Sequence, residues 1–223
     1  MTHFLKLTAM LVFLTLCGSS PALRAFDLLP QNPLDILPEI VLSEKASASS
    51  QLAARELADY YAKATGKTLA TIRTIDPARP QIWVGLLREF ENLPTKISAR
   101  FQTARNEQGF YHLLQQNTLY IIGSQDPGQL YGVYAFLEEQ LGIRWLKIPT
   151  LDDDGEYLPE TPEKIQLTAL DRYSEPDFIY RHFFQTGSYM SHYPQTSIEW
   201  CARVRLQGTG RACDHNAERV PPF

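Results

Sequence analysis

The residues in this sequence most able to do chemistry are its carboxylates, since Asp and Glu together number 25. Acid–base catalysis by a carboxylate pair needs two of them held on opposite sides of a bound substrate, roughly 5–10 Å apart. Nothing in their spacing selects such a pair. The motifs HExxH and GxSxG are also absent from the sequence, which removes the main support for a zinc peptidase or an α/β-hydrolase. No catalytic residue is therefore predicted.

Gly123 and Gly128 (GSQDPG) have the glycine spacing of a phosphate-binding loop. Such a loop requires a lysine directly after the second glycine, and Gln129 stands there instead. Because a bound phosphate would then have no cationic partner, we interpret the segment as a turn from a strand into a helix.

The acidic run Asp152–Gly155 has some features of a calcium-binding loop. Aligned on Gly155, the first and twelfth ligand positions of such a loop fall on Thr150 and Thr161. A calcium loop needs acidic side chains at both positions, so a solvated acidic turn is the better interpretation.

Cysteine usage gives two further alternatives near the C-terminus. Cys201 and Cys213 could pair in an oxidising compartment, or remain thiols. With His215 they could also contribute to a metal site, but the short paired spacing and the fourth ligand of a zinc site are both missing. No metal and no other cofactor is predicted.

The elements that must position any functional residue belong to an ordinary globular chain. Its 223 residues are 44% hydrophobic and 21% charged, enough for one domain and part of a second. The formal net charge is −4, whereas a chain that binds a phosphate backbone normally carries a basic excess. A nucleic-acid partner is therefore not expected.

Residues 1–22 have the pattern of a secretory signal peptide. Leu7–Leu16 is a ten-residue apolar run, and cleavage is expected after Ala22 or, alternatively, after Ala25. The run is too short for the roughly 20 residues that a membrane span requires. The residue before Cys17 is leucine rather than Gly, Ala or Ser, which disfavours lipid attachment. The protein is expected to be exported, to a periplasmic or extracellular location.

Two segments have the apolar periodicity of helices. The first begins after Ser49 or Ser50, either of which can cap it, and ends at Gly66. Asp126 is expected to cap the second, with Gly142 as its stop signal. The predicted buried stripes are Ala53, Leu57, Tyr60, Tyr61 and Ala64 in the first helix, and Leu130, Val133, Tyr134, Leu137 and Leu141 in the second.

The remaining patterns predict mainly strands. Those in the first part of the chain are residues 39–43, 67–72, 81–85, 109–115, 118–123 and 143–146, and a hairpin is expected at Gln116–Asn117. Residues 27–38 look like an extended lead-in. Beyond an acidic, proline-bearing stretch, residues 176–181 are predicted as a strand and Ile198–Leu206 as a helix. This order predicts an α+β fold, a mixed sheet with two helices packed on one face.

The run from Gly109 to Trp145 carries a resemblance to a known family. Its pattern (GF…LYIIG…LYGVY…FLE…LGIRW), together with residues 82–85 (IWVG) and the first helix, resembles the N-terminal α+β domain of α-glucuronidases and β-N-acetylhexosaminidases, and is most similar to exported, uncharacterised relatives of these enzymes. The resemblance covers roughly residues 36–182. Within the run, Gly132 is expected to allow close approach of the helix to the sheet.

The resemblance implies a domain of residues 27–170 followed by the opening strand and helix of a barrel in residues 171–223. A complete (β/α) barrel takes about 250 residues, so the catalytic carboxylates of the family would lie beyond Phe223. The expectation is an accessory, non-catalytic domain of an exported glycoside-hydrolase-like protein that degrades a polysaccharide or glycoconjugate. The alternative is a secreted module that binds glycan or packs against a partner. The oligomeric state stays open.

In hexosaminidases an arginine at the end of the first barrel strand binds hydroxyls of the terminal sugar. The resemblance of residues 176–181 (PDFIYR) to that strand makes Arg181 the candidate substrate-binding residue. A guanidinium suits this role because its fixed fork of donors matches vicinal hydroxyls. The alternative is that Arg181 forms a salt bridge where the two domains meet.

Overall fold

The computed structural model describes residues 25–32, 36–178, 180–181, 183–184, 194–206 and 209–210. The predicted signal peptide, Cys213 and His215 lie outside these residues. No helix in the described ranges is both long enough and apolar enough to cross a bilayer.

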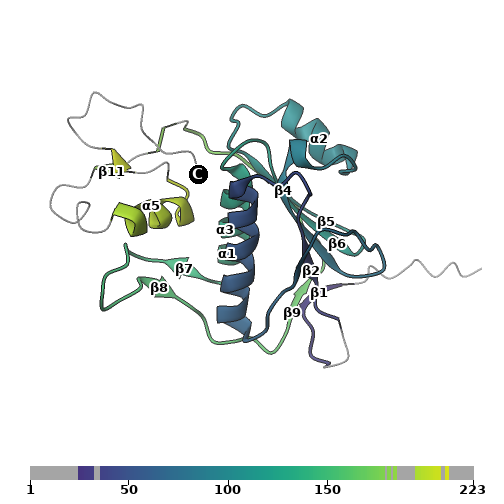
Figure 1. The fold of residues 1–223 in the computed structure, drawn as a ribbon, viewed down its shortest axis with the longest axis horizontal. Coiled ribbons are helices and arrows are strands. Elements are labelled where there is room, and N and C mark those ends of the chain that lie inside the picture. The colour runs from purple at the N-terminus through teal and green to yellow at the C-terminus, as the bar shows by residue number, and fades with distance from the viewer. Residues whose placement is uncertain are drawn as a thin grey trace, which may run out of the picture.

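A six-stranded mixed sheet forms the centre of the molecule (Figure 1). One half is parallel and the other antiparallel, since β3, β2, β4 and β6 run in one direction and β5 and β10 pair antiparallel beyond β6. The predicted α+β class with a mixed sheet is confirmed. In spatial order the strands are β10 (Asp171–Ser174), β5 (Phe110–Gln115), β6 (Thr118–Gly123), β4 (Gln81–Leu86), β2 (Glu39–Val41) and β3 (Thr71–Ile72).

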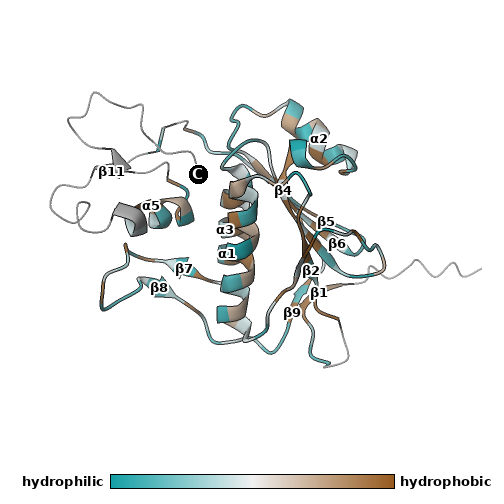
Figure 2. Ribbon diagram, viewed as in Figure 1, coloured by the Kyte–Doolittle hydropathy of each residue, from teal (hydrophilic) through white to brown (hydrophobic). Residues whose placement is uncertain are grey.

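Helices α1 (Ala48–Thr65) and α3 (Gly128–Gln140) lie side by side on one face of this sheet (Figure 1). The strands contribute alternate residues to the two faces, as their pleat requires. Ile121 is part of the core under α1 and α3, whereas its neighbour Ile122 packs on the opposite face. That second face carries a smaller core with α2 (Thr95–Gln102), a helix that follows the 3-10 turn η1 (Leu87–Glu89). Figure 2 shows the apolar colouring of the strands between these layers.

The two main helices end near the predicted glycines, but their N-caps differ from the predicted ones. Gly66 and Gly142 adopt left-handed backbone angles, with φ of 70° and 73°, directly after α1 and close to the end of α3. The prediction that Ser49 or Ser50 caps α1 is wrong, because Ser47 is the N-cap and accepts a hydrogen bond from the backbone of Ser50. Both predicted caps are buried and bind partners far along the chain.

Asp126 does not cap α3, and this prediction is also wrong. The helix begins at Gly128 with Pro127 as its N-cap residue. The Asp126 carboxylate instead accepts hydrogen bonds from Ser49 of α1 and from the side-chain amide of Gln129. It therefore links the starts of the two helices rather than ending one of them.

The hairpin β5–β6 and its contact with α3 are as predicted. Gln116 takes the left-handed backbone that the two-residue turn needs, with φ of 55°. A Cβ atom added to Gly132 of α3 would lie 3.1 Å from Cγ2 of Ile121 and 3.2 Å from Cβ of Phe110. The helix therefore approaches the sheet as closely as a glycine allows.

The other strands form short pairs outside the main sheet. The lead-in contains β1 (Phe26–Leu29), which pairs with β9 (Ile165–Leu167), and the predicted strand at 143–146 is reduced to β7 (Arg144–Trp145), paired with β8 (Glu156–Tyr157). β11 (Phe183–Phe184) pairs with β12 (Thr209–Gly210). Helix α5 spans Pro194–Arg203 rather than 198–206.

The predicted strand at residues 176–181 is wrong for those of its residues that are described, which are irregular. The strand in this region is β10, which lies earlier and extends the main sheet through β5. The sheet thus continues past residue 170, where the boundary between the two domains was predicted.

Candidate functional site

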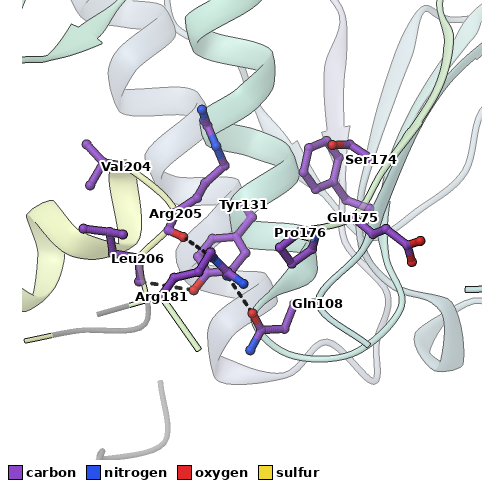
Figure 3. A pocket seen from close by; sticks show the side chains of 10 residues that line it. Gln108, Tyr131, Ser174, Glu175, Pro176, Arg181, Val204, Arg205 and Leu206 are labelled. Carbon is purple, nitrogen blue, oxygen red and sulfur yellow. Dashed lines mark hydrogen bonds between the residues drawn. The ribbon is translucent and has the colours of Figure 1, made fainter. Parts of the chain in front are cut away.

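A hollow of about 270 Å³ lies where the segment around Arg181 and the residues after α5 meet the sheet layer (Figure 3). Its walls come from five parts of the chain: the start of β5 with the loop before it, helix α3, the end of β10 with the residues after it, Arg181, and the turn after α5. The lining residues are Gln108, Phe110, Tyr131, Ser174, Glu175, Pro176, Arg181, Val204, Arg205 and Leu206.

Arg181, the candidate from sequence, lies in this hollow, where its guanidinium donates hydrogen bonds to two backbone carbonyls and one side-chain amide. Its Nε atom donates to the carbonyl of Arg205 at 3.0 Å, and its terminal nitrogens donate to the carbonyl of Phe178 and to Oε1 of Gln108, both at 2.7 Å. The guanidinium carbon lies 5.6 Å from the ring centroid of Tyr131. The bonds to Gln108 and Arg205 connect the loop before β5 with the turn after α5.

Tyr131 forms the apolar floor of the hollow and contacts the opposite wall through its hydroxyl group. This hydroxyl donates to the carbonyl of Leu206 at 3.3 Å. Burial raises the pKa of Tyr131, although the nearby Arg181 acts in the other direction. The phenol is therefore neutral and serves as a hydrogen-bonding group.

Among the ten residues that line the hollow, Glu175 is the sole carboxylate. Burial would raise its pKa, but hydrogen bonds from the Tyr173 hydroxyl and from the backbone of Asn106 and Arg105 outweigh it and lower the pKa to about 2. An ionised carboxylate with these partners is a poor proton donor near neutral pH. The lining residues can bind a polar ligand, but they do not supply an acid and a base.

A second polar cluster lies at the carboxyl end of the parallel strands, where open α/β sheets often bind anions. Glu89 occupies it. Its carboxylate accepts hydrogen bonds from the backbone N–H of Ser47 at 2.9 Å, from the Ser50 hydroxyl at 2.8 Å and from the backbone N–H of Leu86 at 3.0 Å. The Glu89 carboxylate thus occupies the position at the N-terminus of α1 where an anionic ligand could otherwise bind.

The motifs that were interpreted as turns are turns. Gly123 ends β6 and Gly128 begins α3, and a Cβ at Gly123 would lie 2.2 Å from the backbone nitrogen of Gln129. Asp153 and Gly155 lie in the turn between β7 and β8. In the described part of the chain no three His, Cys, Asp or Glu side chains come together as a metal site. Cys201 is a buried thiol whose pKa is raised to about 11 by burial.

Sequence reasoning found Arg181 and missed its neighbours. Gln108 and Arg205 bind Arg181 from positions 73 and 24 residues away, and no local pattern connects them. Tyr131 stands in the run that carries the family resemblance, but it lies outside the predicted buried stripe and was not named as a site residue. The resemblance of residues 176–181 to a barrel strand is the signal in the sequence that pointed to this region.

The fold resembles that of solved glycoside hydrolases. One is a family GH115 4-O-methyl-α-glucuronidase with specificity for decorated arabinogalactans, matched with a TM-score of 0.51 at 14% identity over 76% of this chain and 24% of that one. Another is the GH20 β-N-acetylhexosaminidase of Streptomyces coelicolor A3(2), with a TM-score of 0.42, 14% identity, and 72% and 25% of the two chains covered. The chain spans about a quarter of the length of these structures.

The fold and the sequence both resemble the N-terminal domain of glycoside hydrolases, as was predicted. The particular match is to the family described as "Glycosyl hydrolase family 67 N-terminus", over residues 29–136. None of the curated protein sequences matches the chain significantly.

Proposed function

We propose that this domain is an accessory, non-catalytic part of an exported protein that degrades carbohydrate, and that the hollow at Arg181 binds part of the carbohydrate. The family match over residues 29–136 carries the proposal, because it connects this part of the chain with glycoside hydrolases. The hollow supports it, since a guanidinium, an amide and an aromatic ring together suit a ligand with hydroxyl groups on a partly apolar ring.

A binding role suits the hollow better than catalysis. Glycoside hydrolysis needs a protonated acid and a second carboxylate on the other side of the bond. In the hollow, Glu175 has a pKa of about 2 and every partner it binds stabilises its ionised form. We expect the 223-residue chain to show no turnover of aryl α-glucuronides or aryl N-acetylhexosaminides, and steady release of the aryl group would contradict the non-catalytic role.

Binding is tested by affinity electrophoresis of the chain in gels that contain arabinogalactan, with N,N′-diacetylchitobiose as a soluble competitor. Arg181→Lys should lose most of the retardation, because lysine keeps the charge but cannot span two hydroxyls in a fixed plane. Arg172→Lys is the matched control, since Arg172 pairs with Glu139 on the surface, outside the hollow. Wild-type retardation in Arg181→Lys would return Arg181 to a purely structural role where the segments meet.

Export is tested by expression of the whole chain in a bacterial host. We expect the protein in the periplasm or the medium with Leu23 as its first residue, or Phe26 if the alternative cleavage position is used. A protein that stays in the cytoplasm with Met1 intact would contradict the proposal of export.

A further inference from the structure

Helix α5 ends in an unusual way, with an arginine where a glycine is the ordinary choice. The N–H of Leu206 donates to the carbonyl of Cys201 at 2.7 Å, and that of Arg205 donates to the carbonyl of Ala202 at 3.0 Å. These two bonds are the Schellman pattern of a helix C-terminus, whose left-handed position favours glycine. Arg205 occupies that position with φ of 60°, so its Cβ atom is crowded against its own backbone.

The side chain and the carbonyl of Arg205 have separate partners. Its Nη2 atom lies 2.6 Å from Oε2 of Glu138 on α3. Its carbonyl oxygen accepts the hydrogen bond from Nε of Arg181 at 3.0 Å. In Figure 3 the guanidinium of Arg205 points away from Arg181, while its carbonyl faces it. One residue therefore connects α3 to the residue proposed to bind carbohydrate.

We propose that Arg205 is a positioning residue for the hollow. Its ion pair with Glu138 holds residues 204–206, which form one wall, in the place where the carbonyl of Arg205 can orient Arg181. We call these three residues the strap. A glycine would satisfy the end of α5 with less crowding, so the helix itself does not explain an arginine here. The consequence for carbohydrate binding rests on the function proposed above.

The remaining contacts of the strap explain why its position matters. The carbonyl of Leu206 accepts the hydroxyl of Tyr131, and the carbonyl of Arg205 accepts Arg181, so the strap provides an acceptor for each of these two side chains of the hollow. Both acceptors are backbone atoms and move with the strap. The ion pair between Arg205 and Glu138 connects the strap directly to α3, the helix that carries Tyr131.

The test is Arg205→Gly in the full chain, followed by NMR of the arginine Nε–H groups. The glycine keeps the carbonyl and suits the left-handed backbone, but it removes the ion pair. We expect the midpoint of thermal unfolding to be unchanged or slightly raised, while the Arg181 Nε–H exchanges with water about fivefold faster. Affinity for arabinogalactan should fall by a similar factor, and Arg205→Lys should recover part of both losses.

Two variants on α3 form a matched pair of controls. Glu138→Gln removes the ion pair from the other side and should reproduce the faster Arg181 exchange. Glu139→Gln removes an ion pair of the same length, 2.6 Å to Arg172, that does not involve the strap. Its Arg181 exchange should stay at the wild-type rate.

The proposal would be overturned if the Arg181 Nε–H exchanged with water at the wild-type rate in both Arg205→Gly and Glu138→Gln. It would also be overturned if Glu139→Gln raised this exchange rate as much as they do. If the wild-type chain binds no carbohydrate, the proposed function fails, but the exchange rates still decide whether Arg205 positions Arg181. If the wild type binds and Arg205→Gly binds equally well, the positioning role is overturned while the proposed function stands.

Discussion

The Nε2 atom of His112 lies 2.9 Å from the carbonyl oxygen of Gly132, and this hydrogen bond ties the middle of β5 to the buried side of α3. His112 is fully buried between the rings of Phe110 and Phe136. Its Nδ1 atom has no hydrogen-bond partner among the described residues. Burial, with a smaller contribution from Arg172, outweighs the Gly132 bond and lowers the pKa of His112 to about 4.

This buried imidazole should make the protein sensitive to acid. The fold holds His112 neutral, whereas the unfolded chain takes up a proton near pH 6.5. Between pH 6.5 and pH 4 the unfolded state therefore binds more protons, so the free energy of unfolding falls as the pH falls, by on the order of 3 kcal/mol in total. Below about pH 4 both states are protonated and this contribution stops changing.

The measurement is urea unfolding at several pH values between 4 and 7, for the wild type and for His112→Phe. The variant should show a smaller loss of stability across this range, because a phenyl ring has no proton to take up. Curves of equal slope for the two proteins would contradict the assignment of the acid sensitivity to His112.

Glu89 should contribute to stability because its carboxylate is buried and accepts three hydrogen bonds at the start of α1. Glu89→Gln keeps the size of the side chain but replaces one acceptor with a donor that faces other donors. We expect a loss of about 1–3 kcal/mol in the free energy of unfolding. Glu91→Gln is the control, since Glu91 is 82% exposed and pairs with exposed Lys45. Equal effects of the two changes on the urea midpoint would argue against the buried role of Glu89.

Gly132 allows a prediction in which two physical effects oppose each other. Alanine is better than glycine in a helix by about 1 kcal/mol, so Gly132→Ala would stabilise the protein if there were room. The added Cβ would instead lie 3.1 Å from Ile121 and 3.2 Å from Phe110. We expect a net loss of about 1–3 kcal/mol in the free energy of unfolding. A variant more stable than the wild type in thermal unfolding would show that α3 can move away from the sheet.

The buried stripe of α3 can be tested by a matched pair of truncations on the same helix. Leu137 is fully buried in the main core, and Leu137→Ala should cost about 2–5 kcal/mol because it removes apolar contact and leaves a cavity. Glu139 lies on the exposed side, where it pairs with Arg172. Glu139→Ala should cost about 0.5 kcal/mol or less. Similar losses in urea unfolding would contradict the assigned orientation of the helix.

The sequence was sufficient for features that depend on neighbouring residues. The apolar stripes, the stops at Gly66 and Gly142, the hairpin at Gln116 and the close approach at Gly132 all follow from local spacing and backbone preference. Their physical causes act within a few residues, so a single sequence displays them.

The helix starts were mispredicted because distant partners decide them. Ser50 was expected to cap α1, but its hydroxyl donates to Glu89, 39 residues away. Asp126 was expected to cap α3, but it accepts from Ser49, 77 residues away. The candidate site is limited in the same way: Arg181 could be named from the family resemblance, whereas its partners Gln108 and Arg205 are brought to it only by the fold.

Arg203 forms the ionic contact between α5 and the first helix layer. Its side chain is 14% exposed and lies 3.5 Å from the carboxylates of Glu56 on α1 and Glu156 on β8. Glu156 is 5% exposed and also accepts hydrogen bonds from Tyr60 and Lys63. Two largely buried carboxylates therefore depend on this guanidinium for part of their compensating charge.

Arg203→Met should cost about 1–3 kcal/mol in the free energy of unfolding, because Glu56 loses this cation and Glu156 keeps Lys63 as its ionic partner. Lys45→Met is the control: Lys45 and Glu91 are 71% and 82% exposed, and losing their pair should cost less than about 1 kcal/mol. Adding Glu56→Gln to Arg203→Met should recover part of the loss, since it removes the carboxylate that lost its ion pair with Arg203. If urea unfolding gives Arg203→Met a cost as small as that of Lys45→Met, then α5 is held by its apolar contacts and the ion cluster contributes little.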